Sequence, residues 1–184
     1  LRELQRDGFY DINGVEPSRA AAEQAGGLRD SIYNGMFGPG IYPEGYFDLI
    51  CAFHLLDHIS DPKKFLSDCR AYLKSQGRLF LILHDVSSWP ARLLGPACPV
   101  IDIEHPFLYN KATVTRLLEK SGFKVQKSFR VYNCYPLRYW VQLTPLAGIL
   151  KRPLMALLQG SVFGRVPLTL GAGNMGVIAV KKDE

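Results

Sequence analysis

Two histidines and an aspartate stand within five positions in the segment HLLDH, residues 54–58, directly after the apolar run 47–53. Imidazole and carboxylate groups bind metal ions, and they also act as catalytic bases near neutral pH. A zinc site on such a pair requires both histidines well inside one helix and a third ligand downstream. Because His54 follows a strand-like run and the next helix starts only at Asp61, we expect no metal site. The favoured role of His58 is to cap the helix or to form a hinge, and a direct contact with the substrate is the alternative.

His84 and His105 are two further candidates for a catalytic base. His84 ends the apolar segment 78–84, an expected strand, and His105 lies in the irregular segment IEHPF. Histidine is the side chain whose ordinary pKa suits proton transfer near neutral pH. His105, with Glu104 beside it, is the preferred base, and His54 and His84 are the other candidates. A structural role, in which His105 holds its loop through a backbone hydrogen bond, stays open.

Glu16 follows the strand-like segment 10–15 and precedes Pro17. Open parallel sheets bind ligands at the carboxyl ends of their strands, and a carboxylate there can accept hydrogen bonds from ribose hydroxyls. Position alone favours an exposed loop acid. The functional interpretation of Glu16 therefore depends on the motifs that accompany it.

The composition is that of one globular domain spanning residues 1–184. Hydrophobic residues make up 47% of the chain and charged residues 21%, which is enough for a real core. The net charge of +5 comes from scattered lysines and arginines, so we expect no nucleic-acid partner. Four widely spaced cysteines fit a reducing cytoplasm better than a disulfide scaffold. We find neither a signal peptide nor an apolar run of the roughly 20 residues that span a bilayer.

Short apolar segments alternate with helical patterns, which predicts an α/β domain with a mostly parallel sheet. Helix starts are indicated at the capping residues Ser18, Asp61 and Asn110, and the helix after Asp61 is expected to continue to Gly77. The expected strands cover residues 10–15, 47–53, 78–84, 123–132 and 175–182.

Residues 133–173 form the least familiar part of the chain, apolar with basic residues at intervals. The favoured interpretation is a lid or insert, a pair of short helices that covers a substrate cleft. The alternative is a surface that lies on anionic lipid, since such surfaces combine tryptophan, tyrosine and leucine with arginine and lysine. The residues that motivate a membrane contact are Trp140, Leu143, Arg138, Lys151 and Arg152.

Six motifs occur in a fixed order along the chain: GVEPS, FDLI, HLLDHIxDP, LKxxGRL, EHPF and LLEKSGF. Their order and spacing resemble the class I S-adenosylmethionine-dependent methyltransferases, over residues 1 to about 127 and the closing strand. The branch that methylates quinones, small metabolites and cell-surface sugars or lipids is the most similar. The resemblance implies a Rossmann-like sheet with helices on both faces, an antiparallel last strand, and S-adenosylmethionine as the cofactor.

The resemblance also implies roles for individual residues. Glu16, followed by Pro17, would bind the ribose hydroxyls of the cofactor. No acid follows the third strand near Met36, so Met36 or Phe37 would pack on the adenine instead. Phe53 and His54 would line the methionine half of the cofactor and the methyl-transfer cleft. A hydroxyl acceptor would need a base from the set His105, His54 and His84, whereas a carbon or carboxylate acceptor would need none.

The glycine loop GxGxG of this family does not occur in the sequence. The segment LRELQRDG resembles the helix that follows this loop in relatives, so we expect the natural protein to continue upstream of Leu1 with the first strand and the loop. Without them, either the strands at Glu16 and Phe47 pair directly, or a gap with unpaired backbone N–H and C=O groups remains between them. We expect residues 1–184 alone to bind the cofactor poorly and to be inactive.

Two other functions stay open. An NAD(P)-dependent oxidoreductase also places an acid after its second strand, although neither HLLDHIxDP nor the late GFKV strand belongs to that fold. A catalytically degenerate methyltransferase-like binding module is the non-enzyme alternative. The sequence favours methyl transfer to a small-molecule, glycan or lipid-linked acceptor, in the cytoplasm and with possible membrane contact through 133–173.

Overall fold

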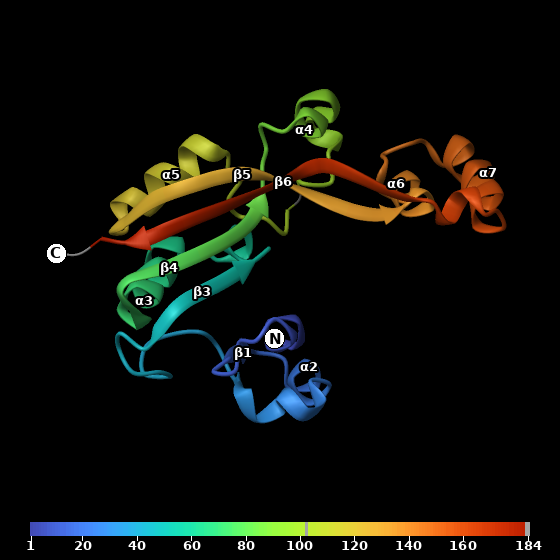
Figure 1. The fold of residues 1–184 in the computed structure, drawn as a ribbon. Coiled ribbons are helices and arrows are strands. Elements are labelled where there is room, and N and C mark those ends of the chain that lie inside the picture. Colours follow the sequence, from blue (N-terminus) through green and yellow to red (C-terminus); the bar gives the residue numbers. More distant parts are fainter. Residues whose placement is uncertain (102, 183–184) are drawn as a thin grey trace.

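The computed structural model describes residues 1–101 and 103–182 of the chain, which contain two sheets and a set of short helices (Figure 1). The strands are β1 (Gly14–Glu16), β2 (Ile32–Asn34), β3 (Phe47–Phe53), β4 (Leu73–His84), β5 (Phe123–Pro136) and β6 (Pro167–Lys181). The α-helices are α1 (Arg2–Arg6), α2 (Arg19–Glu23), α3 (Pro62–Tyr72), α4 (Trp89–Leu94), α5 (Lys111–Lys120), α6 (Leu137–Leu143) and α7 (Gly148–Gln159). Short 3-10 turns are η1 (Gly26–Ser31), η2 (Leu56–His58), η3 (Gly95–Ala97) and η4 (Phe163–Arg165).

The larger sheet has four strands in the order β3-β4-β6-β5. β3 and β4 are parallel, and β6 is antiparallel to both β4 and β5, so only the last strand runs against the others. This arrangement confirms the expected α/β, Rossmann-like fold with an antiparallel final strand. The carboxyl ends of β3 and β4 consequently lie at the same edge of the sheet.

The smaller sheet consists of β1 and β2 alone, paired in parallel from Gly14 opposite Ile32 to Glu16 opposite Asn34. β1 and β3 belong to different sheets, so the described strands do not close the sheet by pairing directly. Side-chain contacts join the two parts, among them the Tyr42 hydroxyl, which donates to the Gly14 carbonyl at 3.2 Å. β3 is therefore an edge strand of the larger sheet.

Several element boundaries differ from the sequence expectation. The helix that was expected to reach Gly77 ends at Tyr72, because the backbone turns to the extended conformation at Leu73 and passes through the left-handed region at Gln76 (φ 59°). β5 and β6 are 14 and 15 residues long, and both continue past the sheet as a two-stranded ribbon (Figure 1). The first strand is shorter than expected, since Tyr10 lies outside β1 and is 87% exposed.

The core lies between the larger sheet and the helices α3 and α5. Alternate residues of β4 are buried, as expected of a strand whose successive side chains point to opposite faces. The fully buried members of this core are Leu66, Cys69, Leu73, Leu79, Leu81, Leu83, Val114, Leu118, Phe123, Val177 and Ala179. This packing fixes the position at which β4 delivers its last residue, His84.

Asn110 is expected to stabilise α5 by about 1 kcal/mol through its cap. Its side chain accepts from the Thr113 N–H at 3.0 Å, and the Thr113 hydroxyl accepts from the Asn110 N–H at 2.9 Å, a reciprocal capping box. Asn110→Ala should lower the free energy of unfolding by about 1 kcal/mol in urea titrations. Because Gly restores solvent access to the helix end, Asn110→Gly should cost only a few tenths of a kcal/mol. Equal losses in both variants would contradict the capping role.

Candidate active site

All four histidines of the chain gather at the carboxyl edge of the larger sheet. The ring centroids of His54 and His84 are 4.9 Å apart, those of His84 and His105 are 5.0 Å apart, and those of His58 and His105 are 4.6 Å apart. We call these four side chains, together with Asp57, the histidine cluster. Residues from three separate segments of the chain therefore meet at one point.

The parallel pairing of β3 and β4 brings His54 beside His84. Phe53 lies opposite Ile82 in the ladder, and the His54 N–H donates to the Ile82 carbonyl at 2.7 Å, which adds one more rung. His54 then leaves the strand with φ 49°, a left-handed conformation that is uncommon for a residue with a side chain. Such conformations concentrate at functional sites, where surrounding structure holds them in place.

Asp57 is the buried acid of the cluster, with 2% of its surface exposed. It lies in η2, the short turn that follows β3. Its Oδ2 accepts from the His84 backbone N–H at 3.2 Å and lies 3.9 Å from the Nε2 of His84. Its Oδ1 is buried and has no hydrogen-bond partner among the residues that the structure describes. A buried carboxylate oxygen without a partner is rare and points to an unfilled interaction.

His84 is held by a neighbour on β6. Asn174 lies directly opposite His84 in the antiparallel ladder, and its Oδ1 is 2.9 Å from the Nδ1 of His84. Because an amide oxygen only accepts, Nδ1 carries the proton and donates, which turns Nε2 toward Asp57. Burial lowers the pKa of His84 below the ordinary imidazole value, and Asp57 and Asn174 act in the opposite direction.

His58 connects η2 to the segment that carries His105. Its Nδ1 lies 3.0 Å from the carbonyl oxygen of Glu104, to which it donates. Such a bond holds a neighbouring segment in place, which is the structural type of role that the sequence favours for His58. His105 is partly buried, and its Nδ1 has no hydrogen-bond partner within the described part of the chain. The role of His105 as a base stays a prediction.

Tyr109 and Asn174 contribute to the site although no motif in the sequence pointed to either. Tyr109 is 6% exposed and its buried hydroxyl has no partner in residues 1–101 and 103–182. Burial, with the nearby Asp57 carboxylate acting in the same direction, raises the pKa of Tyr109 to about 12. The only sequence signal for Tyr109 is its place two residues after EHPF, and for Asn174 its place at the start of the final apolar strand.

Glu16 lies at the carboxyl end of β1, half-buried, next to the loop that follows β2. Its Oε1 accepts from the Ser18 N–H at 2.8 Å, while its backbone carbonyl accepts from Asn34 Nδ2 at 2.8 Å and from the Gly35 N–H at 3.2 Å. These bonds place the Asn34–Met36 segment beside Glu16. Pro17 is exposed in the same turn.

The remaining predicted contact residues occupy different environments. Phe37 is partly buried and packs against the core, with its ring centroid 5.2 Å from that of Phe65 and 5.8 Å from that of Tyr72. Met36 is 74% exposed, so of the two residues proposed for an adenine it is the accessible one. Phe53 is 49% exposed at the end of β3 and makes an edge-to-face contact with Phe80, with ring centroids 5.1 Å apart.

Comparisons with known proteins place this arrangement in a family. Residues 1–128 match the protein family described as "Methyltransferase domain". No curated protein matches the sequence.

Solved structures share the fold at low sequence identity. An S-adenosylmethionine-dependent methyltransferase from Archaeoglobus fulgidus is 16% identical with a TM-score of 0.60, covering 98% of this chain and 80% of that one. A methyltransferase of the same kind from Thermotoga maritima is 18% identical with a TM-score of 0.58, covering 94% and 73%. The cyclase SpnF is 16% identical with a TM-score of 0.61, covering 100% and 70%, so the fold also carries other chemistry.

The family match spans 128 of 184 residues and includes β1 to β4, Glu16, HLLDH and His105. Its extent agrees with the range over which the six sequence motifs occur. The chain therefore belongs to the methyltransferase-domain family with the class I fold.

Proposed function

We propose that this protein transfers a methyl group from S-adenosylmethionine to a small-molecule, glycan or lipid-linked acceptor, with Glu16 binding the cofactor and the histidine cluster facing the acceptor. The observation that carries the proposal is the placement of both features at the carboxyl ends of parallel strands, Glu16 on β1 and the cluster on β3 and β4. Ligands of open α/β sheets bind at the carboxyl ends of the strands.

The residues near Glu16 fit the nucleoside part of S-adenosylmethionine. A carboxylate at the end of a strand can accept from both hydroxyls of a ribose, and the bond from Ser18 engages only one lone pair of Oε1. The adjoining exposed Met36 offers an apolar, polarizable surface for an adenine ring. Phe53 and His54 are proposed to line the methionine half.

S-adenosylmethionine supplies a methyl carbon that its sulfonium already activates, so alignment of the acceptor is the main task of the chain. A hydroxyl acceptor must also lose a proton. We propose His54 as the group that takes it, because its ring is exposed whereas His84 and His105 are partly buried. His84 and His105 support the ring of His54 from within the cluster, and either of them is the alternative base.

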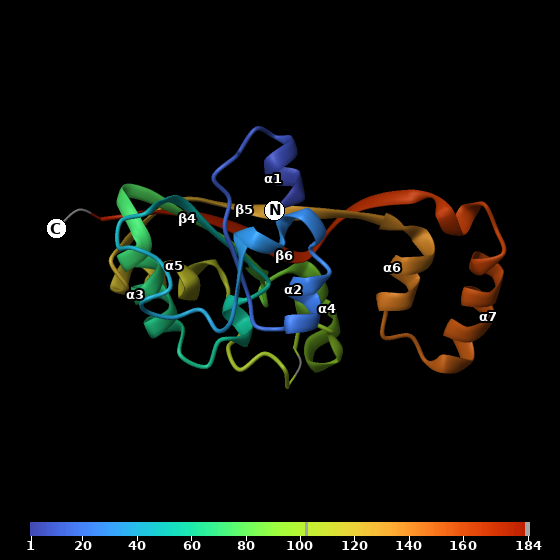
Figure 2. The ribbon, with the colours of Figure 1, turned by 90° about the horizontal axis from the view of Figure 1, so that it is seen from below.

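The hairpin of α6 and α7, residues 137–166 with η4, is proposed to contact a lipid surface or a lipid-linked acceptor. It lies beyond the far ends of β5 and β6 in both views (Figures 1 and 2). The most exposed apolar side chains of the hairpin are Ile149, Leu150, Leu157, Val162 and Phe163. Across residues 1–101 and 103–182, every helix falls short of the length and apolar character that a membrane span needs.

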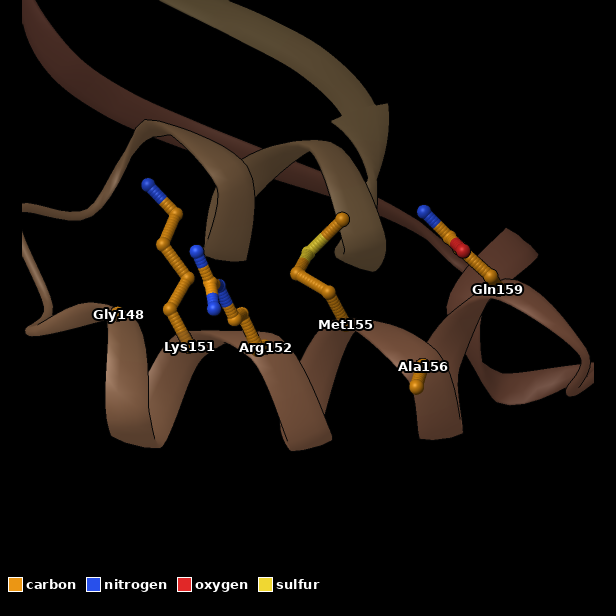
Figure 3. A pocket seen from close by; sticks show the side chains of 6 residues that line it. All are labelled: Gly148, Lys151, Arg152, Met155, Ala156 and Gln159. Atoms are coloured by element: carbon orange, nitrogen blue, oxygen red, sulfur yellow. The ribbon is translucent and has the colours of Figure 1, made fainter.

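Charge supports an anionic surface as the partner of the hairpin. The sequence contains no aspartate or glutamate between Glu119 and Asp183. Lys151 and Arg152 line a hollow of about 430 Å³ on α7, and both side chains extend toward α6 (Figure 3). Lys151 donates to the Thr144 carbonyl at 2.9 Å, which ties α7 to the loop after α6.

Neutralising Lys151 and Arg152 should weaken binding to anionic vesicles about 30-fold, since each basic residue near such a surface contributes about 1 kcal/mol. The variant Lys151→Gln with Arg152→Gln keeps an amide that can donate to Thr144. Vesicle co-sedimentation at low salt measures the effect. Lys124→Gln with Lys127→Gln, an equal charge change on β5, is the matched control and should bind like wild type. Equal losses in both pairs would mean that net charge alone is responsible.

Isothermal titration of the full-length protein tests the proposed function. Binding of S-adenosylhomocysteine, together with methylation of a phenolic or isoprenoid-linked acceptor from labelled S-adenosylmethionine, is the expected result. Binding of NAD(P) in its place would identify an oxidoreductase. Binding of neither would leave the degenerate binding module as the function.

A further inference from the structure

The histidine cluster carries a feature that proton transfer does not require. Asp57, His84 and His105 each present one ligand atom, and these atoms all lie within 4.8 Å of one another. Two imidazoles and a carboxylate form a ligand set found in catalytic zinc sites, which leave a further position open. We propose that Asp57, His84 and His105 bind one divalent transition-metal ion, of which Zn²⁺ fits the ligand set best.

The state of the carboxylate is the first argument. Asp57 is 2% exposed, its Oδ2 is held by the His84 N–H, and its Oδ1 has no partner among the described residues. A buried charge is costly unless it is paired or coordinates a metal. The Nε2 of His84 lies 3.9 Å from Oδ2, which is too long for a hydrogen bond. A cation between the two atoms would compensate the charge.

The hydrogen bonds of the ring nitrogens that face away from the proposed ion also support metal binding. Metal-binding histidines donate their other N–H to a carbonyl or carboxylate, which fixes the tautomer and the direction of the ligating nitrogen. His84 donates from Nδ1 to the Asn174 side-chain oxygen at 2.9 Å. Its Nε2 lone pair consequently points into the cluster. His58 makes the same kind of bond to the Glu104 carbonyl and thereby anchors the segment that delivers His105.

The spacing is the third argument. Tetrahedral ligation with bonds of about 2.1 Å places ligand atoms about 3.4 Å apart. The three ligand atoms, within 4.8 Å of one another, would have to move by only about 1 Å to reach this geometry. Side-chain rotation of His105, which is only partly buried in its loop, can supply such a movement.

This proposal departs from the expectation drawn from HLLDH. The sequence predicts no metal site because the two histidines of the motif do not lie well inside one helix. In the fold, the ligands come from η2, from the end of β4 and from the loop at 105, so sequence spacing is not the relevant measure. His54 remains outside the ligand set and can still act as the base, whereas His84 and His105 could serve as bases only in the metal-free protein.

A role for the ion in methyl transfer rests on the proposed function, whereas binding itself does not. A bound Zn²⁺ lowers the pKa of a coordinated hydroxyl and would therefore favour an oxygen acceptor. The experiment below needs neither cofactor nor acceptor, so a failed metal titration and a failed methylation assay are separate results.

Isothermal titration of the chelator-treated full chain with ZnCl₂ is expected to show one ion per chain with a dissociation constant below about 1 µM. Co²⁺ should produce visible absorption bands of a nitrogen- and oxygen-ligated ion. Asp57→Asn, which preserves shape and the bond from the His84 N–H, should weaken binding at least 100-fold, and Asn174→Ala about 10- to 100-fold. Asp48→Asn, an equal charge change on the exposed side of β3, is the matched control and should bind like wild type.

Circular dichroism checks that the variants are folded, and His105→Gln, at a less buried position, repeats the test should Asp57→Asn unfold. The absence of Zn²⁺ and Co²⁺ binding at about 1 mM metal would overturn the proposal. Unchanged affinity in both Asp57→Asn and His105→Gln would place the ion elsewhere and would equally overturn it.

Discussion

Replacing His54 by Asn is expected to lower the rate of methyl transfer to a hydroxyl acceptor about 100- to 10,000-fold, the usual contribution of a positioned general base. Asn is the suitable replacement because His54 has φ 49°, and Asn adopts this left-handed conformation more readily than most residues. The substitution therefore removes the imidazole while it keeps the backbone turn after β3. Initial rates with labelled S-adenosylmethionine measure the effect.

The acceptor provides the control for His54. A phenol acidic enough to be ionised at the assay pH needs no base, so the loss in His54→Asn should shrink toward tenfold or less with such an acceptor. An equal loss with neutral and ionised acceptors would assign His54 to positioning. A variant that is as fast as wild type with a neutral hydroxyl would move the base role to His105 or His84.

Replacing Glu16 by Gln is expected to weaken the binding of S-adenosylhomocysteine to the full-length protein about 10- to 150-fold. Hydrogen bonds to a charged group contribute about 1.5–3 kcal/mol each, and about 1.4 kcal/mol corresponds to a tenfold change in affinity. Gln retains an oxygen that can accept from the Ser18 N–H, the 2.8 Å bond that shapes the turn before α2. The measured loss then reports on the ribose rather than on the turn.

Glu23→Gln is the matched control for Glu16→Gln. Glu23 is the last residue of α2 and pairs with Arg19 at 2.8 Å on an exposed surface. Its substitution should therefore leave cofactor affinity unchanged. 2'-Deoxy-S-adenosylhomocysteine gives a second check, because it should bind the wild type weakly and should lose little more in Glu16→Gln. Additive losses from the two changes would show that Glu16 does not bind the diol.

Local sequence signals predicted those parts of the fold that depend on local physics. The caps at Ser18, Asp61 and Asn110 are present as expected, because a side-chain acceptor two or three residues before free backbone N–H groups acts within one turn. β3 matches its predicted range, since a continuous apolar run bounded by polar residues has few alternatives.

Expectations that depend on tertiary pairing were less accurate. β5 and β6 are longer than their apolar periodicity indicates, because each satisfies the backbone of the other beyond the sheet. Helical periodicity continues past Tyr72, yet pairing with β3 draws Leu73 into β4. Pairing of this kind cannot be derived from spacing along one segment.

In the candidate site, too, residue types could be predicted from the sequence, whereas their proximity in space could not. HLLDH and IEHPF were identified from residue type, but only the fold brings His54, His84 and His105 together and adds Asn174 from β6. Phe37 is a predicted adenine contact by position, and only the fold shows that its ring also packs on Phe65 and Tyr72 beside the core. Residue chemistry is local information, whereas proximity between distant segments is not.

A crystal structure of the full-length protein with S-adenosylhomocysteine is the most direct test of the assignment on which the proposed function depends. The predicted result is a ribose whose two hydroxyls donate to the Glu16 carboxylate, with the methionine half extending toward Phe53 and His54. A Glu16 side chain that contacts only Ser18 and solvent, with the nucleoside bound elsewhere, would contradict the account.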